Sequence, residues 1–315
     1  MDPAKGLILH HYGSSPFSEK VRLALGMKGM HWRSVTVPNM LPKPDVVALT
    51  GGYRRTPFMQ IGADIYCDSA LMCRLIDRLV PEPPLYPEST HGLAAIVSQW
   101  ADQSFFWTAV PFTMQPAGVA HVLAGMPVES VKAFGADRAA MSPAFRRAPL
   151  HDQAAHFHDY LGRLEHLLAD DRPFLLGALP SIADVSAAQS IWFVRRAPPV
   201  AAHLDGYRRI DVWYERVKAF GHGTHEDMAS AEAILLASRS TAFAPCAIDA
   251  GAGIAAGTPV GVTPADYAHD EVTGRLVGLD AGEVVVERVD ERAGTVHVHF
   301  PRVGYHVKVI RKDSP

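Results

Sequence analysis

The chain has 315 residues, 48% of them hydrophobic and 20% charged, which is enough for two or three domains with sizeable cores. Its formal net charge of −3 gives no general attraction to nucleic acid or to an anionic membrane. Its three cysteines make no disulfide framework, and no apolar stretch approaches the ~20 residues of a membrane span. We therefore expect a cytoplasmic protein that binds neither nucleic acid nor a membrane.

Strand and helix signals alternate over residues 1–80, which predicts a mixed α/β domain. The predicted helices begin at Pro16 and Ser69, and Gly29 follows the first of them as a stop signal. A further short helix is expected within residues 40–50. The predicted strands cover residues 7–11, 32–37, 58–61 and 65–67.

A proline-rich segment, residues 80–87, separates this domain from a helical region, because proline cannot continue a helix. Periodicity then predicts an all-helical domain over residues 89–240, without internal repeats. The predicted helices cover residues 91–110, 127–140, 149–169, 182–195, 206–220 and 225–238.

The composition changes again after residue 240, where Ala, Gly, Thr and Pro indicate a second linker. Residues 258–312 then show five short strand patterns separated by turn signals, which predicts a small all-β, SH3-like barrel domain. The predicted strands cover residues 258–262, 272–279, 283–289, 295–300 and 305–310. From residue 241 onward there are seven Lys/Arg and ten Asp/Glu, a balance of 7 − 10 = −3, which argues against a nucleic-acid surface.

Ser15 precedes Pro16 at the predicted start of the first helix. Pro suits the first helical position, so Ser15 is expected to be the N-cap. The same place suits an anion, because a helix N-terminus carries about +0.5 charge and free N–H groups. A hydroxyl there can also donate to a thiolate, and the two effects together would lower the pKa of a bound thiol by about two units.

Two further pairs carry possible binding chemistry. Thr56-Pro57 stands at a strand start, where a cis bond would turn the Thr56 backbone outward toward an extended ligand. Asp68-Ser69 opens a helix, and the pair either caps that helix or holds the carboxylate and ammonium of a ligand. Taken singly, each pair is explained by capping or turn formation.

In this order and spacing the motifs resemble those of the glutathione transferase family. Ser15-Pro16-Phe17 resembles the motif of its serine-using and omega-like classes, and Arg55-Thr56-Pro57 with Asp68-Ser69 resembles its cis-proline and γ-glutamyl signature. Ser181 to Asp184 resembles the capping box of the family's helical domain. The resemblance spans roughly residues 7–220 and implies a thioredoxin-like α/β domain followed by an all-α helical bundle.

The resemblance also implies roles. Ser15 would face the sulfur of glutathione, the Thr56 backbone beside Pro57 would pair with the cysteinyl unit, and Asp68 and Ser69 would hold the γ-glutamyl end. Arg55 is expected at the glycyl carboxylate, and Phe17 belongs to the glutathione-binding set through its motif. The second substrate would be a small hydrophobic electrophile, and the family implies a homodimer. The candidates for the apolar wall of the pocket that would bind this substrate are Trp100, Phe105, Phe106 and Trp107.

Several alternatives stay open at this point. Ser14 and Tyr12 are rivals for the hydroxyl that faces the sulfur. His297 and His299 share a strand face, but no third ligand follows a known spacing, so no metal is expected. The predicted function is transfer of glutathione to an electrophile, with an isomerase or dehalogenase as a variant. The alternative is a non-catalytic glutathione- or ligand-binding scaffold with the barrel as an interaction module.

Overall fold

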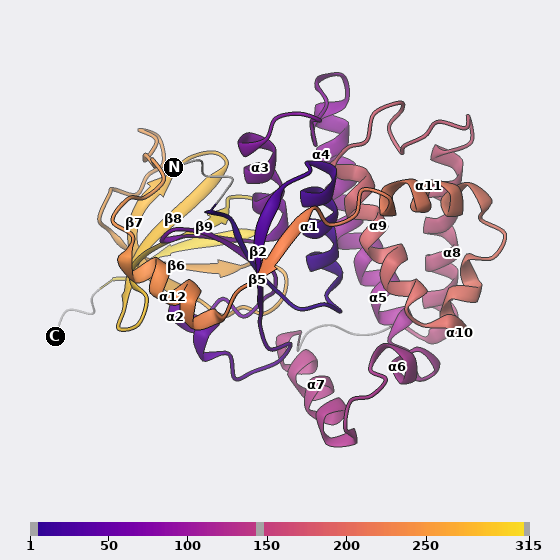
Figure 1. Ribbon diagram of the computed structural model, residues 1–315, viewed down its shortest axis with the longest axis horizontal. Coiled ribbons are helices and arrows are strands. Elements are labelled where there is room, and N and C mark those ends of the chain that lie inside the picture. Colours follow the sequence, from indigo (N-terminus) through magenta and orange to yellow (C-terminus); the bar gives the residue numbers. More distant parts are fainter. Residues whose placement is uncertain (1–5, 143–147, 312–315) are drawn as a thin grey trace.

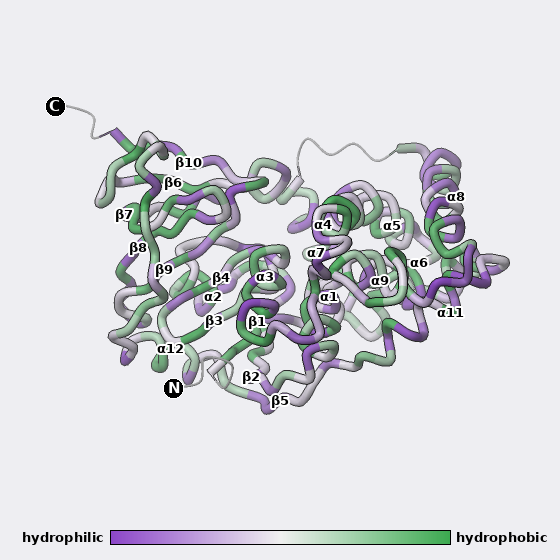
Figure 2. Tube along the Cα trace, turned by 90° about the horizontal axis from the view of Figure 1, so that it is seen from above, coloured by the Kyte–Doolittle hydropathy of each residue, from purple (hydrophilic) through white to green (hydrophobic). Residues whose placement is uncertain are grey.

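A computed structural model describes residues 6–142 and 148–311 of the chain. The ends of two predicted domains, residues 1–5 and residue 312, lie outside these described residues. A ten-stranded mixed sheet occupies one side of the molecule and a helical bundle the other (Figure 1). Figure 2 shows the same division from above, with hydrophobic residues along the strands and a largely hydrophilic outer helix α8.

The first part of the sheet is the predicted α/β unit. Strand β1 pairs in parallel with β2 and antiparallel with β3, which in turn pairs antiparallel with β4. The elements are β1 (Ile8–His11), α1 (Pro16–Met27), β2 (His31–Thr36), α2 (Pro44–Thr50), β3 (Phe58–Ile61), β4 (Asp64–Cys67) and α3 (Ser69–Leu79). These bounds lie within one residue of those predicted for the six main elements, which confirms the α/β domain.

Side chains alternate along the strands and so divide the core in two. Leu9 and Met59 face α1, α3 and the helical bundle. Ile8 and Phe58 point to the opposite face, where α2 and α12 (Ser230–Arg239) cover the sheet. The α/β unit is therefore buried on both faces.

The first bundle helix contains a π-helical segment that the sequence did not indicate. The predicted helix at 91–110 is divided by a π-helical segment, Ala101–Phe105, which inserts an extra residue into the turn. The bundle helices are α4 (His91–Trp100), α5 (Phe106–Thr113), α6 (Pro116–Val122), α7 (Val128–Met141), α8 (Leu150–Leu167), α9 (Ile182–Arg195), α10 (Pro198–Ala201) and α11 (Arg208–Lys218), with 3-10 turns at Glu88–Thr90 and Ala202–Leu204.

The predicted capping box is present at the start of the central helix α9. Ser181 N–H donates to Asp184 Oδ2 at 2.8 Å, and Ala183 N–H donates to Ser181 Oγ at 3.3 Å. Trp213 of α11 also donates its indole N–H to Asp184 Oδ1 at 2.8 Å. The buried carboxylate therefore fixes both the helix start and a neighbouring helix.

The predicted helix at 225–238 begins too early. Residues Thr224–Asp227 form a strand, β5, which pairs in parallel with the outer edge of β2, and the helix α12 begins at Ser230. Gly221 and Gly223, both at positive φ, turn the chain onto that edge. The open hydrogen-bonding groups of β2 thus decide the conformation of a segment whose local pattern suits a helix.

The five C-terminal strands are confirmed as strands, but they continue the main sheet. They are β6 (Pro259–Pro264), β7 (Val272–Leu279), β8 (Glu283–Asp290), β9 (Gly294–Pro301) and β10 (Tyr305–Val309). The strand order is β10-β6-β7-β8-β9-β4-β3-β1-β2-β5, and β9 lies parallel to β4. Within the described residues no pairing joins β10 back to β9, so closure into an SH3-like barrel stays a prediction.

Within residues 6–142 and 148–311, every helix is too short or too polar to cross a lipid bilayer.

Candidate functional site

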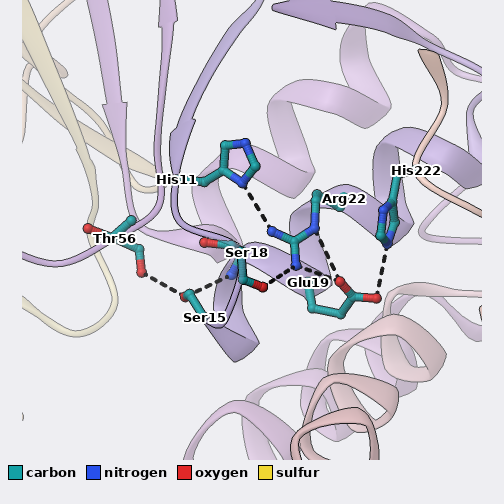
Figure 3. A network of polar contacts seen from close by, with 8 residues as sticks. His11, Ser15, Ser18, Glu19, Arg22, Thr56 and His222 are labelled. Carbon is teal, nitrogen blue, oxygen red and sulfur yellow. Dashed lines mark hydrogen bonds and ion pairs between the residues drawn. The ribbon is translucent and has the colours of Figure 1, made fainter. Parts of the chain in front are cut away.

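The predicted sulfur-facing residue, Ser15, is the N-cap of α1. Its Oγ accepts a hydrogen bond from Ser18 N–H at 3.2 Å and lies 3.5 Å from the Thr56 carbonyl oxygen (Figure 3). The second contact is longer than an ordinary O–H···O bond. The Ser15 proton is therefore weakly held and available to a better acceptor on that side.

A buried network fixes the loop before Ser15 (Figure 3). The Arg22 guanidinium donates to the Gly13 carbonyl at 3.2 Å, to Glu19 at 2.6 Å and to His11 Nδ1 at 3.0 Å. His222, from beyond the helical bundle, contacts the other oxygen of Glu19 at 3.0 Å. Arg22 is thus a positioning residue, since it orients the loop that presents Ser15.

His11 keeps a single tautomer in this network. Burial, together with the nearby Arg22 charge, lowers the pKa of His11 to about 4, so the ring is neutral near pH 7. Because Nδ1 accepts from Arg22, Nε2 carries the proton and donates to Ser34 Oγ at 3.1 Å.

The Thr56-Pro57 bond is cis, as the family pattern implies. Thr56 Oγ1 accepts a hydrogen bond from Lys43 Nζ at 3.2 Å. Burial, with the nearby Arg138 charge, lowers the pKa of Lys43 to about 8. Sequence reasoning missed Lys43, although this amine lies beside the same cavity as Ser15.

Asp68 is the N-cap of α3 and has a positive φ of 77°, an unusual conformation for a residue with a side chain. One carboxylate oxygen accepts from Ala70 N–H at 2.8 Å. The other accepts from the Tyr305 hydroxyl at 3.1 Å. Asp68 therefore caps the helix with one oxygen, contacts the last strand with the other, and lines a cavity.

The C-terminal strands contribute to this site, which the sequence did not indicate. Arg55 forms an ion pair with Asp266 and donates to the Tyr267 carbonyl, and its guanidinium lies 3.8 Å from the centre of the Tyr267 ring. Tyr267 in turn packs edge-on against Trp107 of α5, with ring centres 5.1 Å apart. A loop between β6 and β7 therefore bridges the α/β unit and the helical bundle.

A buried ion pair joins α1 to the helical bundle. Lys20, which is fully buried, contacts Asp102 of the π-helical segment, and Gln189 of α9 donates to the other oxygen of Asp102 at 2.8 Å. Asp102 also lines a cavity beside Asp68 and Ser69. A π-helical insertion frequently marks a functional site, and here two residues of the segment, Asp102 and Gln103, line that cavity.

All seven predicted site residues lie around two adjoining cavities. Pro57, Asp68 and Ser69 line the first, of about 390 Å³, and Ser15 lines the second, of about 660 Å³. The residues common to both walls are Phe17, Arg55, Thr56, Trp107 and Tyr267. The roles of these residues toward glutathione stay predictions.

Two of the four residues predicted to form the apolar wall line a cavity. Phe106 and Trp107 line the larger cavity, whereas Phe105 is fully buried and stacks against Trp100 at 5.5 Å within the helical core. Tyr12 and Ser14 also line the larger cavity, so the structure keeps both rivals of Ser15 near the same space.

Comparison with known proteins agrees with these observations. The model of the glutathione S-transferase N-terminal domain matches residues 9–84, and that of the C-terminal domain matches residues 135–216. A crystal structure of a GST-like protein from Pseudomonas syringae is 42% identical, with a TM-score of 0.78, and the alignment covers 97% of this chain and 100% of that one. The chain belongs to the glutathione S-transferase family.

Two more distant structures share the fold. A glutathione S-transferase from Rhodospirillum rubrum F11 is 20% identical, with a TM-score of 0.51, and covers 68% of this chain and 88% of its own. The beta-etherase LigF from Sphingobium sp. strain SYK-6 is 16% identical, with a TM-score of 0.53, and covers 68% and 95%. A search of curated proteins finds no match. Unlike the Pseudomonas protein, these two structures leave about a third of the chain unmatched.

Proposed function

We propose that this member of the family is a serine-type glutathione transferase that activates the thiol of glutathione and transfers it to a small hydrophobic electrophile. The observation that carries the proposal is the line of residues from Asp68 and Ser69 past the Thr56 backbone to Ser15, along two adjoining cavities. An extended tripeptide with an amino acid end and a central thiol suits that line.

The chemistry follows from the start of α1. The thiol proton leaves to solvent, and the remaining thiolate is stabilised by the Ser15 hydroxyl and the positive end of the helix. The sulfur then forms a bond to an electrophilic carbon in the larger cavity, and a leaving group departs with its bonding electrons. Phe106 and Trp107 supply an apolar surface for that second substrate.

The test compares Ser15→Ala with Ser14→Ala and Tyr12→Phe. We expect Ser15→Ala to raise the pKa of bound glutathione by about one unit or more, because one charge-assisted hydrogen bond is lost while the helix end remains. Conjugation of an aryl halide at pH 7 would fall about 3- to 25-fold, since less thiolate is present. Ultraviolet absorbance of the thiolate and initial rates measure both effects, and an unchanged thiol pKa in Ser15→Ala with glutathione bound would leave Ser15 as a cap alone.

A second candidate, a non-catalytic glutathione-binding scaffold, has its own support. Asp68 already accepts from Tyr305, and Arg55 is already engaged by Asp266 and Tyr267, so both predicted ligand contacts are shared with the C-terminal strands. Retention on immobilised glutathione without turnover of a panel of aryl halides, epoxides and haloalkanes would favour this candidate.

A cytoplasmic location, expected from the sparse cysteines of the sequence, and a homodimer, implied by the family resemblance, also belong to the proposal. Light scattering coupled to size-exclusion chromatography gives the oligomeric state directly. A mass of one chain at micromolar protein concentration would contradict the homodimer.

A further inference from the structure

Three buried side chains meet where the C-terminal strands join the α/β unit. Asp64 on β4 lies in register with His297 on β9, and His299 lies two residues further along the same face. His299 Nε2 is 2.8 Å from Asp64 Oδ1, and His297 Nδ1 is 4.0 Å from that same oxygen. One donor atom from each residue lies within 4.8 Å of the other two.

Both ring nitrogens of His299 face carboxylate oxygens, which accept hydrogen bonds and do not donate them. Nδ1 contacts Glu283, and Nε2 contacts Asp64. If Nδ1 donates its proton to Glu283, the lone pair of Nε2 points at the negatively charged oxygen of Asp64, and the two atoms repel each other. A positive charge between them removes this repulsion, and either a proton or a metal cation can supply it.

His297 distinguishes these two possibilities. The residue is only 7% exposed, and its Nδ1 has no hydrogen-bond partner. A proton shared by His299 and Asp64 leaves this buried nitrogen unsatisfied, which costs free energy. A cation bound by Asp64, His297 and His299 satisfies all three groups at once.

The second atom of each candidate ligand faces a protein group. His299 Nδ1 contacts Glu283, His297 Nε2 lies 3.6 Å from Glu287, and Asp64 Oδ2 accepts from Ala244 N–H at 2.8 Å. Carboxylates on the outer nitrogens of metal-binding histidines fix the tautomer and turn the inner lone pairs toward the metal. This outer set of contacts is what a metal site requires.

We propose that Asp64, His297 and His299 form a zinc site that ties the C-terminal strands to the edge of the α/β sheet. Two imidazoles and one carboxylate suit Zn²⁺, with a fourth position left for water. Donors about 2.0–2.1 Å from a tetrahedral zinc lie about 3.3 Å apart, which falls between the observed 2.8 and 4.0 Å.

The surroundings place the ion between three segments of the chain and give it a path of entry. Asp64 and His299 open onto a cavity of about 1440 Å³ whose described lining residues include none of those around the two cavities beside Asp68 and Ser15. The linker before β6 covers the cluster, because Phe243 stacks on His297 with ring centres 3.9 Å apart. The ion would thus join β4, β9 and this linker.

The experiment uses the full chain, freed of metal by a chelator and titrated with Zn²⁺ in competition with a chromogenic chelator. We expect one zinc per chain, bound about 100-fold or more tightly than by His297→Ala or Asp64→Asn, because each change removes a ligand. Glu283→Gln keeps all three ligands and is expected to weaken binding about 10- to 100-fold. The matched control is His306→Ala, which removes an exposed histidine of β10 and leaves the affinity unchanged.

The wild-type protein decides the question even if a variant fails to fold. Its cobalt complex should show the visible absorption of a four-coordinate ion, and zinc should raise its Tm but not that of folded His297→Ala. Equal zinc affinity in wild type and His297→Ala overturns the proposal. The proposal is also overturned if the wild-type chain binds no zinc and the Asp64→Asn variant is less stable than the wild type. The cluster would then be an ion-pair network only.

Discussion

The hydroxyl of Tyr305 donates to Oδ2 of Asp68 at 3.1 Å, which links the last strand of the sheet to the N-cap of α3 across 237 residues of sequence. Through this bond, and through the contact of Asp266 with Arg55, the C-terminal strands reach the site at which the motifs of the α/β unit are gathered. They are a part of that site as well as an extension of the sheet.

The Tyr305 contact is tested by Tyr305→Phe. A hydrogen bond to a charged group contributes about 1.5–3 kcal/mol, so the free energy of unfolding should fall by about 1.5 kcal/mol or more. If Asp68 holds the ammonium of glutathione, the affinity of the protein for glutathione should also fall several-fold, since the Asp68 carboxylate loses the hydroxyl that orients it. Urea denaturation and isothermal titration calorimetry measure the two effects.

The control is Tyr53→Phe, which removes the hydroxyl that lies 3.3 Å from that of Tyr305 and leaves the bond to Asp68 in place. Its effect on glutathione affinity should be smaller. Equal losses in the two variants would show that the pair acts through packing and not through the carboxylate.

Acid should destabilise the protein through His10, which stacks on Phe58 and bonds to Gln60 at 2.9 Å. Burial lowers the pKa of His10 to about 4, against smaller opposing effects of Gln60 and Asp45. Between pH 6.5 and about 4 the unfolded chain binds a proton that the folded chain refuses, so the free energy of unfolding falls as the pH falls. A shift of this size corresponds to about 3 kcal/mol over the window.

The measurement is a series of urea denaturation curves from pH 7 to pH 4. His10→Asn should lower the stability at pH 7 but flatten the dependence on pH. His11, whose pKa is also lowered to about 4, keeps part of the slope in that variant. A slope identical to that of the wild type would contradict the assignment to His10.

Two helical glycines should respond in opposite ways to the same substitution. A Cβ at Gly26 of α1 would lie 2.1 Å from the Gly221 carbonyl oxygen, a backbone atom that cannot rotate away. Gly26→Ala should therefore destabilise the protein by about 1–3 kcal/mol or more. It should also displace His222 from Glu19, because His222 follows Gly221 in the chain.

The matched control is Gly162→Ala in α8, where a Cβ would meet no atom within 4 Å. Alanine is favoured over glycine inside a helix by about 1 kcal/mol, so this variant should be more stable than the wild type. Urea denaturation of both variants gives the comparison, and two changes of the same sign would show that the contact with Gly221 is not the cause.

The sequence alone identified the elements whose signals are local. Ser15, Asp68 and Ser181 all cap the helices they were expected to begin, because a cap depends on N–H groups only two or three residues away. The family motifs in the α/β unit were recognisable for the same reason. The five C-terminal strands were also found, since their alternating pattern and turns are carried within a few residues.

Only the tertiary structure decided what those elements meet. The pairing of β9 with β4, of β5 with β2, and the approach of Tyr305 to Asp68 join segments separated by far more residues than any local pattern spans. The cluster of Asp64, His297 and His299 shows the consequence most clearly. The spacing of two histidines on one strand did not predict a metal site, because the third side chain of the cluster comes from another strand. Hydrogen bonding between β4 and β9 brings Asp64 into register with His297.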